Sequence, residues 1–202
     1  MQLLFFVEEP SAEAALIELV PKILSGRRYK YDIFTFQGKQ DLLKKLPKRL
    51  RAYRAMPGDD WAIIVLVDRD QDDCKVLKQQ LETTARDAGL ATRASRRPDE
   101  RITVVNRIAI EELEAWFLGD PAALHAAYPR VTEHLAHQAR FRDPDAIQGG
   151  TWETLESLLA YYHPGGLEKI RAASEISAHM EPDLNRSKSF QVFRDALRSL
   201  FT

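Results

Sequence analysis

The stretch WAIIVLVDRDQDDC, Trp61–Cys74, joins the clearest predicted strand of the 202-residue chain to its densest acidic cluster. Seven uncharged residues, most of them β-branched or large and apolar, lead directly into four aspartates within six positions. A continuous apolar run predicts a strand that is covered on both faces, as in a parallel sheet. Crowded carboxylates repel one another, so the strand end is either an acidic helix start or a site for a cation.

The rest of the chain predicts strands and helices in alternation. Strands are expected at 2–9, 29–38, 61–68 and 102–110, and helices at 10–24, 39–56, 72–89 and 111–120, with a kink or break at Pro47 and a turn at 57–60. This order predicts an α/β fold, with a mainly parallel, Rossmann-like sheet flanked by helices. Residues 1–120 would form this core, and residues 121–202 a helical C-terminal portion packed on it.

Composition narrows the class of protein. The chain is 45% hydrophobic and 29% charged, so it can bury a core, and its net charge of −1 predicts no particular partner. A single cysteine excludes an intramolecular disulfide framework and indicates a reducing cytoplasm. No segment approaches the roughly 18 apolar residues of a membrane helix, so no membrane partner is expected.

The acidic cluster lies where ligand sites form in parallel sheets, beyond the carboxyl ends of the strands. Asp68 ends its strand, and Asp70, two residues on, would point the same way if the chain stays extended. The first strand ends in Glu8-Glu9, so Glu8 joins these two aspartates if the two strands are neighbours. A hard divalent cation, Mg²⁺ or Mn²⁺, would relieve the repulsion among the three carboxylates.

Other uses of two spaced aspartates compete with this prediction. An EF-hand loop requires Gly at position 73 and Glu at position 79, where the chain has Asp73 and Gln79, so we reject it. A phosphatase with an aspartate nucleophile fits less well, because the fifth position of its motif is Asp72 here and two predicted strands and two predicted helices precede it. A glycosyltransferase that holds a metal–nucleotide sugar is possible on the motif alone. Asp72 and Asp73 are suited to capping the next helix.

Three quoted motifs together favour one interpretation. FFVEEPSAEAAL, FQGKQDLLKKL and VLVDRDQDD resemble the TOPRIM domain of topoisomerases, primases and OLD-type nucleases. NRIAIEELEAWFLGD, FRDPDAI, GGTWE and NRSKSFQVF are similar to the domain of unknown function 4276 family, a bacterial family often encoded beside ATPases of the OLD/ABC kind. The first resemblance covers about 120 residues, and the second covers nearly the whole chain.

The resemblance to TOPRIM implies a role for each acid. Glu8 would be the general acid/base, Asp68 and Asp70 would bind the metal, and Glu114, with Glu111 on the same helix face at i, i+3, would support a second metal ion. The alternative for the last two is a solvated amphipathic helix. Glu9 departs from the family pattern, which has glycine at this position.

Basic residues predict contacts with phosphate. The segment 26–54 has ten Lys or Arg residues against two aspartates, and it is either a surface for a polyanion or an ordinary solvated helix face. The candidate phosphate-binding residues are Lys39, Lys44, Lys45, Lys48, Arg186 and Lys188.

The sequence thus predicts a Mg²⁺-dependent TOPRIM-type nuclease, the effector of an ATPase-linked anti-phage defence or toxin system, with a nucleic acid substrate. The alternatives are a non-catalytic subunit of the same fold that binds an ATPase or nucleic acid, and a metal-dependent phosphatase or nucleotidyl transferase. Homo-oligomerisation is left open.

Overall fold

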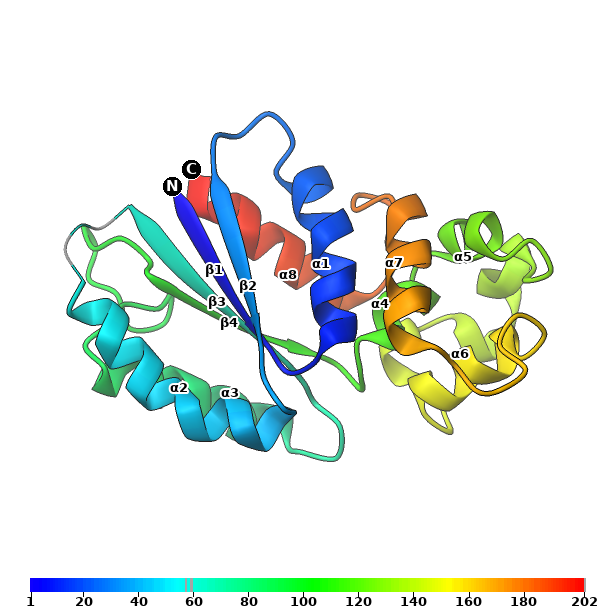
Figure 1. Ribbon diagram of the computed structural model, residues 1–202, viewed down its shortest axis with the longest axis horizontal. Helices are drawn as coiled ribbons and strands as arrows, with labels where there is room; N and C mark the ends of the chain where they lie inside the picture. The colour runs from blue at the N-terminus through cyan, green and yellow to red at the C-terminus, as the bar shows by residue number, and fades with distance from the viewer. Residues whose placement is uncertain (57, 59, 202) are drawn as a thin grey trace.

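The computed structural model describes residues 1–56, 58 and 60–201 and contains one sheet with helices on both faces (Figure 1). The four strands are parallel throughout and lie in the order β2-β1-β3-β4. Their bounds are Gln2–Val7 (β1), Lys30–Thr35 (β2), Trp61–Asp68 (β3) and Val104–Ala109 (β4). The predicted α/β, Rossmann-like class is confirmed.

Eight α-helices complete the described part of the chain. Their bounds are Pro10–Ile23 (α1), Lys39–Arg54 (α2), Cys74–Asp87 (α3), Glu114–Leu118 (α4), Pro121–Ala127 (α5), Thr151–Leu159 (α6), Lys169–His179 (α7) and Lys188–Arg198 (α8). Short 3₁₀ helices cover Glu133–His137, Ala139–Phe141, Pro144–Ala146 and Ser199–Phe201.

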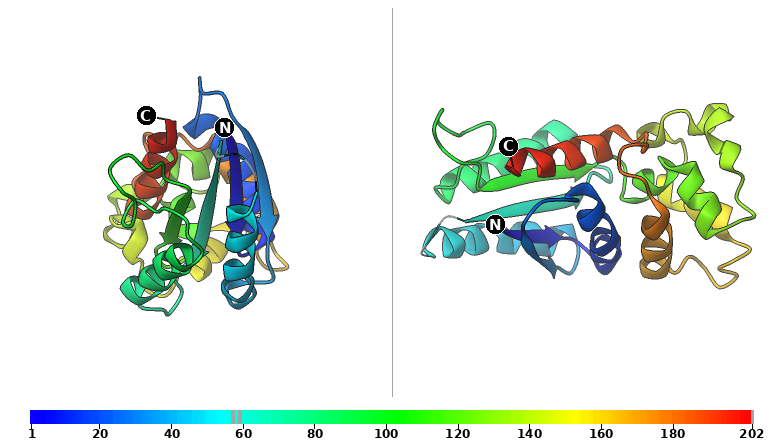
Figure 2. Two further views of the ribbon diagram at one scale, coloured as in Figure 1. Left: turned by 90° about the vertical axis from the view of Figure 1, so that its left-hand side faces the viewer. Right: turned by 90° about the horizontal axis from the view of Figure 1, so that it is seen from above.

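The two faces of the sheet bury two separate apolar clusters because side chains alternate along each strand. Alternate residues of β1 and β3, such as Phe5 and Ile64, pack with α1 and α8, whereas their neighbours Phe6 and Val65 pack with α2 and α3. Figure 2 shows the resulting three layers from the side and from above. This double coverage explains the continuous apolar run of β3.

The segment from α4 to α7 lies beyond the carboxyl edge of the sheet and packs on α1 (Figure 1). Lys22 of α1 joins the two parts, because its ammonium donates to the carbonyls of Ser177, Ala178 and Met180 at the C-terminal end of α7. The buried Trp116 of α4 then packs its ring on α8. The last helix therefore returns to the sheet face beside α1.

Two expected details differ in the structure. Helix α2 runs through Pro47 without a break, because its buried leucines anchor the helix on both sides of the proline. The expected helix at 111–120 begins only at Glu114, since Glu111 has a left-handed backbone with φ 62°. Glu111 and Glu114 therefore do not share a helix face. The turn expected at 57–60 includes residues 57 and 59, which lie outside the described residues.

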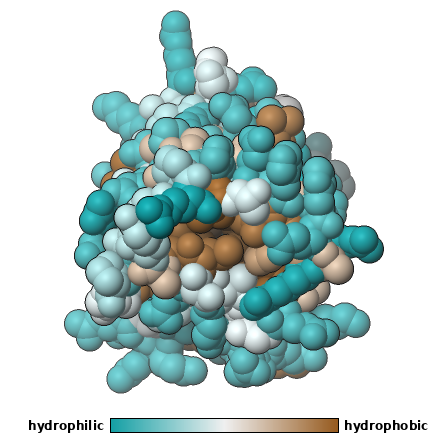
Figure 3. All heavy atoms as spheres, turned by 90° about the vertical axis from the view of Figure 1, so that its right-hand side faces the viewer, coloured by the Kyte–Doolittle hydropathy of each residue, from teal (hydrophilic) through white to brown (hydrophobic). Residues whose placement is uncertain are grey.

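The end of the molecule away from the sheet is uneven in polarity. Figure 3 shows apolar side chains in a hollow there, surrounded by polar ones. Among the described residues, no helix combines the length and the apolar character that a membrane crossing requires.

Candidate active site

The carboxyl ends of β1 and β3 form the first part of the site. These strands are neighbours in the sheet, with Val7 opposite Leu66, so Glu8 lies beside the end of β3. A carboxylate oxygen of Glu8 accepts a hydrogen bond from the backbone N–H of Asp68 at 2.7 Å. Adjacent parallel strands thus bring together two acids that are 60 residues apart in the chain.

The backbone turns sharply just after Asp68. Asp70 is left-handed, with φ 49°, and its N–H donates to the carbonyl of Glu111 at 2.9 Å. Arg69 forms an ion pair with the carboxylate of Glu111 in the same turn. Non-glycine residues with positive φ are uncommon and concentrate at functional sites. The chain is no longer extended at Asp70, so the geometric reason for expecting Asp68 and Asp70 to point the same way does not hold, although both residues line one pocket.

Lys39 supplies the positive charge of this site. Its ammonium is 2.7 Å from a carboxylate oxygen of Asp70, 2.7 Å from one of Asp72 and 3.1 Å from the carbonyl oxygen of Arg69. The residue is only 8% exposed. Burial alone would lower the pKa of Lys39, but the hydrogen bonds to the two aspartates raise it above its usual value. Lys39 was expected to bind phosphate, and the structure gives it carboxylate partners.

Asp68 has no such counter-charge. Its side chain forms no hydrogen bond or ion pair with any residue that the structure describes. Burial, followed by the nearby carboxylates of Glu8 and Glu114, raises the pKa of Asp68 well above its ordinary range. A proton or a cation must therefore compensate the charge of this carboxylate.

The pKa values of Glu8 and Glu114 are raised, like that of Asp68. Burial raises the pKa of each to about 7, although the N–H of Asp68 opposes the shift at Glu8 and Lys169 opposes it at Glu114. Glu114 lies in the first turn of α4 and is 3% exposed. The ammonium of Lys169 is 3.8 Å from its carboxylate. Near-neutral carboxyl groups of this kind are suited to proton transfer.

The helical segment contributes one wall of the site, which the sequence did not predict. The carboxylate of Glu112 accepts hydrogen bonds from the hydroxyl of Thr151 and the N–H of Trp152, both at 2.9 Å, and so caps α6. Lys169, at the start of α7, places its ammonium 4.7 Å from the centre of the Trp152 ring. The helical C-terminal portion was expected, but nothing in the sequence places the start of α6 beside the acidic strand ends.

An open pocket of about 530 Å³ lies beside these groups, and Glu114 is not among the residues that line it. Glu8, Asp68, Asp70, Lys39, Glu112 and Lys169 all line it. Within residues 1–56, 58 and 60–201, however, no three His, Cys, Asp or Glu side chains have metal-binding geometry. Two contacts account for this: Glu8 faces the backbone of Asp68, and Asp70 faces Lys39.

Other candidate residues lie away from the pocket. Glu111 is held by Arg69, and the guanidinium of Arg186 donates to the carbonyls of Phe141 and Arg142. Lys188 lines a different pocket, beside β4. Lys44, Lys45 and Lys48 are exposed on α2, where Lys45 pairs with Asp41 at 2.7 Å.

The NRSKS motif stabilises the fold. The amide of Asn185 donates to the carbonyl of Trp116, and the hydroxyl of Ser187 accepts the N–H of Phe190 as the N-cap of α8. Ser187 and Ser189 both donate to the carboxylate of Asp145. These contacts join α4 to α8.

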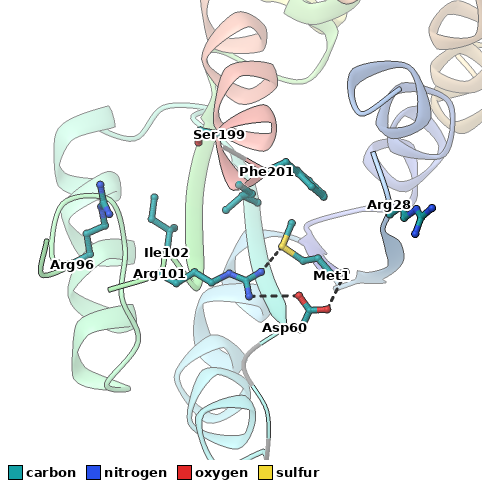
Figure 4. Close-up of a pocket in the computed structure, with 9 residues that line it drawn as sticks. Met1, Arg28, Asp60, Arg96, Arg101, Ile102, Ser199 and Phe201 are labelled. Atoms are coloured by element: carbon teal, nitrogen blue, oxygen red, sulfur yellow. Dashed lines mark hydrogen bonds and ion pairs between the residues drawn. The ribbon is translucent and has the colours of Figure 1, made fainter. Parts of the chain in front are cut away.

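A larger pocket of about 690 Å³ lies at the opposite, amino-terminal edge of the sheet (Figure 4). Its central carboxylate, Asp60, is 3.1 Å from the N-terminal amine and 3.6 Å from the guanidinium of Arg101. The N-terminal amine lowers the pKa of Asp60. Since this acid is compensated within the chain, the carboxyl edge is the better candidate for catalysis.

A comparison with known protein families agrees with the second resemblance, the one carried by the motifs NRIAIEELEAWFLGD, FRDPDAI, GGTWE and NRSKSFQVF. The sequence profile of a family described as "Domain of unknown function (DUF4276)" matches residues 7–198. The chain belongs to the DUF4276 family. No curated protein and no solved structure matches it. In this DUF4276 protein the match spans both the sheet and the helical segment, and therefore both walls of the acidic pocket.

The raised pKa values predict how the stability of the metal-free protein depends on pH. Folded Glu8 and Glu114 keep protons that the unfolded chain has lost, so the free energy of unfolding should fall as pH rises from about 4.5 to about 7. For Glu114 the loss should be about 3 kcal/mol. Urea denaturation at several pH values in this range measures the free energy of unfolding. Added Mg²⁺ should restore stability above pH of about 7, where the carboxyl groups are ionised, but not below about 4.5, where they are protonated.

The double variant Glu8→Gln, Glu114→Gln is the matched control, because it keeps the hydrogen-bonding shape of both side chains without their charge. It should be less dependent on pH than the unmodified protein over the same range. Stability curves of equal slope for the two proteins would contradict the assignment of these protons.

Proposed function

We propose that this protein is a nuclease that cleaves phosphodiester bonds of DNA or RNA at the carboxyl edge of its sheet, with Mg²⁺ or Mn²⁺ as cofactor. One observation carries the proposal: the carboxylate of Asp68 lies close enough to those of Glu8 and Glu114 for their charges to raise its pKa, and it has no hydrogen-bond or ion-pair partner among the described residues. Buried acids without a counter-charge are stable only with a proton or a cation. Since the donors are all oxygen atoms, a hard divalent cation fits them.

The acids at this edge of the sheet then have separate roles. Asp68 and Asp70 would hold the cation, and Glu114 would support a second ion. Asp70 would exchange its contact with Lys39 for the metal. A bound divalent ion polarises the scissile phosphate and lowers the pKa of the attacking water. Glu8, whose pKa is about 7, would accept the proton of that water near neutral pH.

The lysines on two sides of the pocket support a phosphate-containing substrate. Lys39 and Lys169 both line the pocket, and they come from α2 and α7. Positive groups held in place before the reaction lower the energy of the transition state, in which negative charge develops on the phosphate. A carboxylate-only pocket would instead repel a nucleic acid.

The test is cleavage by the purified protein of single- and double-stranded DNA and RNA, in Mg²⁺, in Mn²⁺ and in a chelator. Cleavage should require the metal, and its rate should rise with pH as Glu8 loses its proton, at a pH below about 7 because the bound cation lowers the pKa of a neighbouring carboxyl. Calorimetry should detect binding of Mg²⁺ to the same protein. Absence of both metal binding and cleavage would reject the proposal.

A second candidate is a non-catalytic subunit that binds nucleic acid or a partner ATPase. The contact of Lys39 with Asp70 and Asp72 favours it, because the chain supplies its own cation to two of the acids. Binding of nucleic acid without cleavage in any metal would support this role. In either role we propose an OLD/ABC-type ATPase as partner, within an anti-phage defence or toxin system.

A further inference from the structure

A pocket of about 400 Å³ lies at the free edge of the sheet, apart from the acidic site. Strand β4 is hydrogen-bonded to β3 alone, and α3 and α8 contact it. The pocket lies among these elements and is lined by the apolar groups of Cys74, Ile108, Ile110 and Val192. It can therefore accept the apolar part of a ligand.

Two buried polar atoms of residues that line this pocket have no partner. Asn106 is 1% exposed; its amide donates to Glu82 at 3.1 Å, but its carbonyl oxygen Oδ1 accepts no hydrogen bond. The Nε of Arg107 is also buried and donates to no acceptor. An unsatisfied buried group costs about 1–3 kcal/mol, and of these two atoms only the Nε of Arg107 is a donor that an anionic group can satisfy; the Oδ1 of Asn106 would accept a hydrogen bond and does not favour an anion.

The charges of the lining residues are predominantly positive. Arg107 donates through Nη1 to the carbonyl of Asn106 at 3.0 Å, but it forms no ion pair within the described chain. Lys188 is exposed at the start of α8 and has no ion pair there either. The one acid of the lining, Asp145, already accepts hydrogen bonds from Ser187 and Ser189. Lys78 also lines the pocket but is paired at 2.6 Å with Glu82, whose charge acts on Arg107 as well. Arg107 and Lys188 still leave the lining positive, so an anion is the complementary ligand.

We propose that this pocket binds a small organic anion, one with an apolar body and a single carboxylate or phosphate group. The anionic group pairs with the guanidinium of Arg107, within reach of Lys188. The apolar body packs on Ile108, Ile110 and Val192. This site requires neither the metal nor the nuclease activity proposed above.

Cys74 makes the proposal directly testable, because it is the single cysteine of the chain and lines the pocket. The full-length protein is equilibrated with aryl disulfides that differ only in a carboxylate or a carboxamide, in the presence of a competing thiol. Mass spectrometry measures the fraction of Cys74 that carries each fragment. The carboxylate should be favoured about tenfold, as one charge-assisted hydrogen bond to Arg107 predicts.

Two substitutions test whether the preference for the carboxylate fragment arises in this pocket. Arg107→Gln should bring the ratio of carboxylate to carboxamide labelling close to one. Val192→Glu should do the same without disturbing the core, since Val192 is 41% exposed. Arg97→Gln, in the exposed loop before β4, is the matched control and should retain the preference.

A disulfide of the same carboxylate without the aryl ring should label Cys74 less than the aryl acid, because the apolar contact is missing. Equal labelling by acid and amide in the unmodified protein would overturn the proposal. So would a preference for the acid that survives both Arg107→Gln and Val192→Glu. None of these outcomes depends on whether the protein cleaves nucleic acid.

Discussion

Asp68→Asn should lower metal-dependent cleavage at least about a hundredfold and leave the protein folded. The substitution keeps the shape of the side chain and removes the charge that we propose binds the cation. No contact of the Asp68 side chain within the described residues is lost, because it has none. The metal-free variant should be at least as stable as the unmodified protein, since a half-buried carboxyl near Glu8 and Glu114 no longer ionises.

Cleavage rates and thermal denaturation, each with and without Mg²⁺, measure the two effects. Asp73→Asn is the matched control on the same loop: Asp73 caps α3 through the N–H groups of Lys75 and Val76, and asparagine caps helices equally well. This control should retain cleavage. Full activity of Asp68→Asn would exclude Asp68 as an essential metal ligand.

The second large effect is expected on helix α2, where a quadruple substitution to Gln at Lys44, Lys45, Lys48 and Arg49 should weaken nucleic acid binding. Leu42, Leu46 and Leu50 of α2 are buried on the sheet, so these four cations are exposed on its outer face. The helix begins at Lys39, inside the acidic pocket, and extends away from it along the sheet (Figure 1). Its outer face can therefore guide a phosphate backbone to the site.

The salt dependence of binding measures how many phosphates the helix contacts. Each contact releases condensed counterions, so log affinity falls linearly with log salt concentration. Loss of four contacts should reduce the slope by about 3 on single strands and about 4 on duplex. Binding of Mg²⁺ at Asp68 and Asp70 should not change.

A second quadruple variant controls for net charge. Gln at Arg86, Arg93, Arg96 and Arg97 removes four exposed cations from the end of α3 and the following loop. It should leave the slope nearly unchanged if α2 is the contact surface. An unchanged slope in the α2 variant would instead exclude this helix as the track, and would favour a phosphatase or nucleotidyl transferase that acts on a small substrate.

The sequence predicts the secondary structure well where a single local signal decides it. The strand expected at 61–68 is β3 to the residue, because an uninterrupted apolar run is stable only when both faces are covered. Prediction failed where tertiary contacts outweigh local preference. The helix expected at 39–56 is not broken at Pro47, and Glu111 has the left-handed backbone that an ordinary helix start does not require.

The sequence by itself determined the α/β class, the order of the elements and the position of Glu8 and Asp68 at strand ends. These properties follow from local periodicity and from the geometry of adjacent parallel strands. Only the tertiary structure decided that Lys39 binds Asp70 and Asp72, and that Glu112 and Lys169 complete the pocket from the helical segment. These contacts join residues far apart in the chain through turns and helix packing, and no local pattern records where such segments meet.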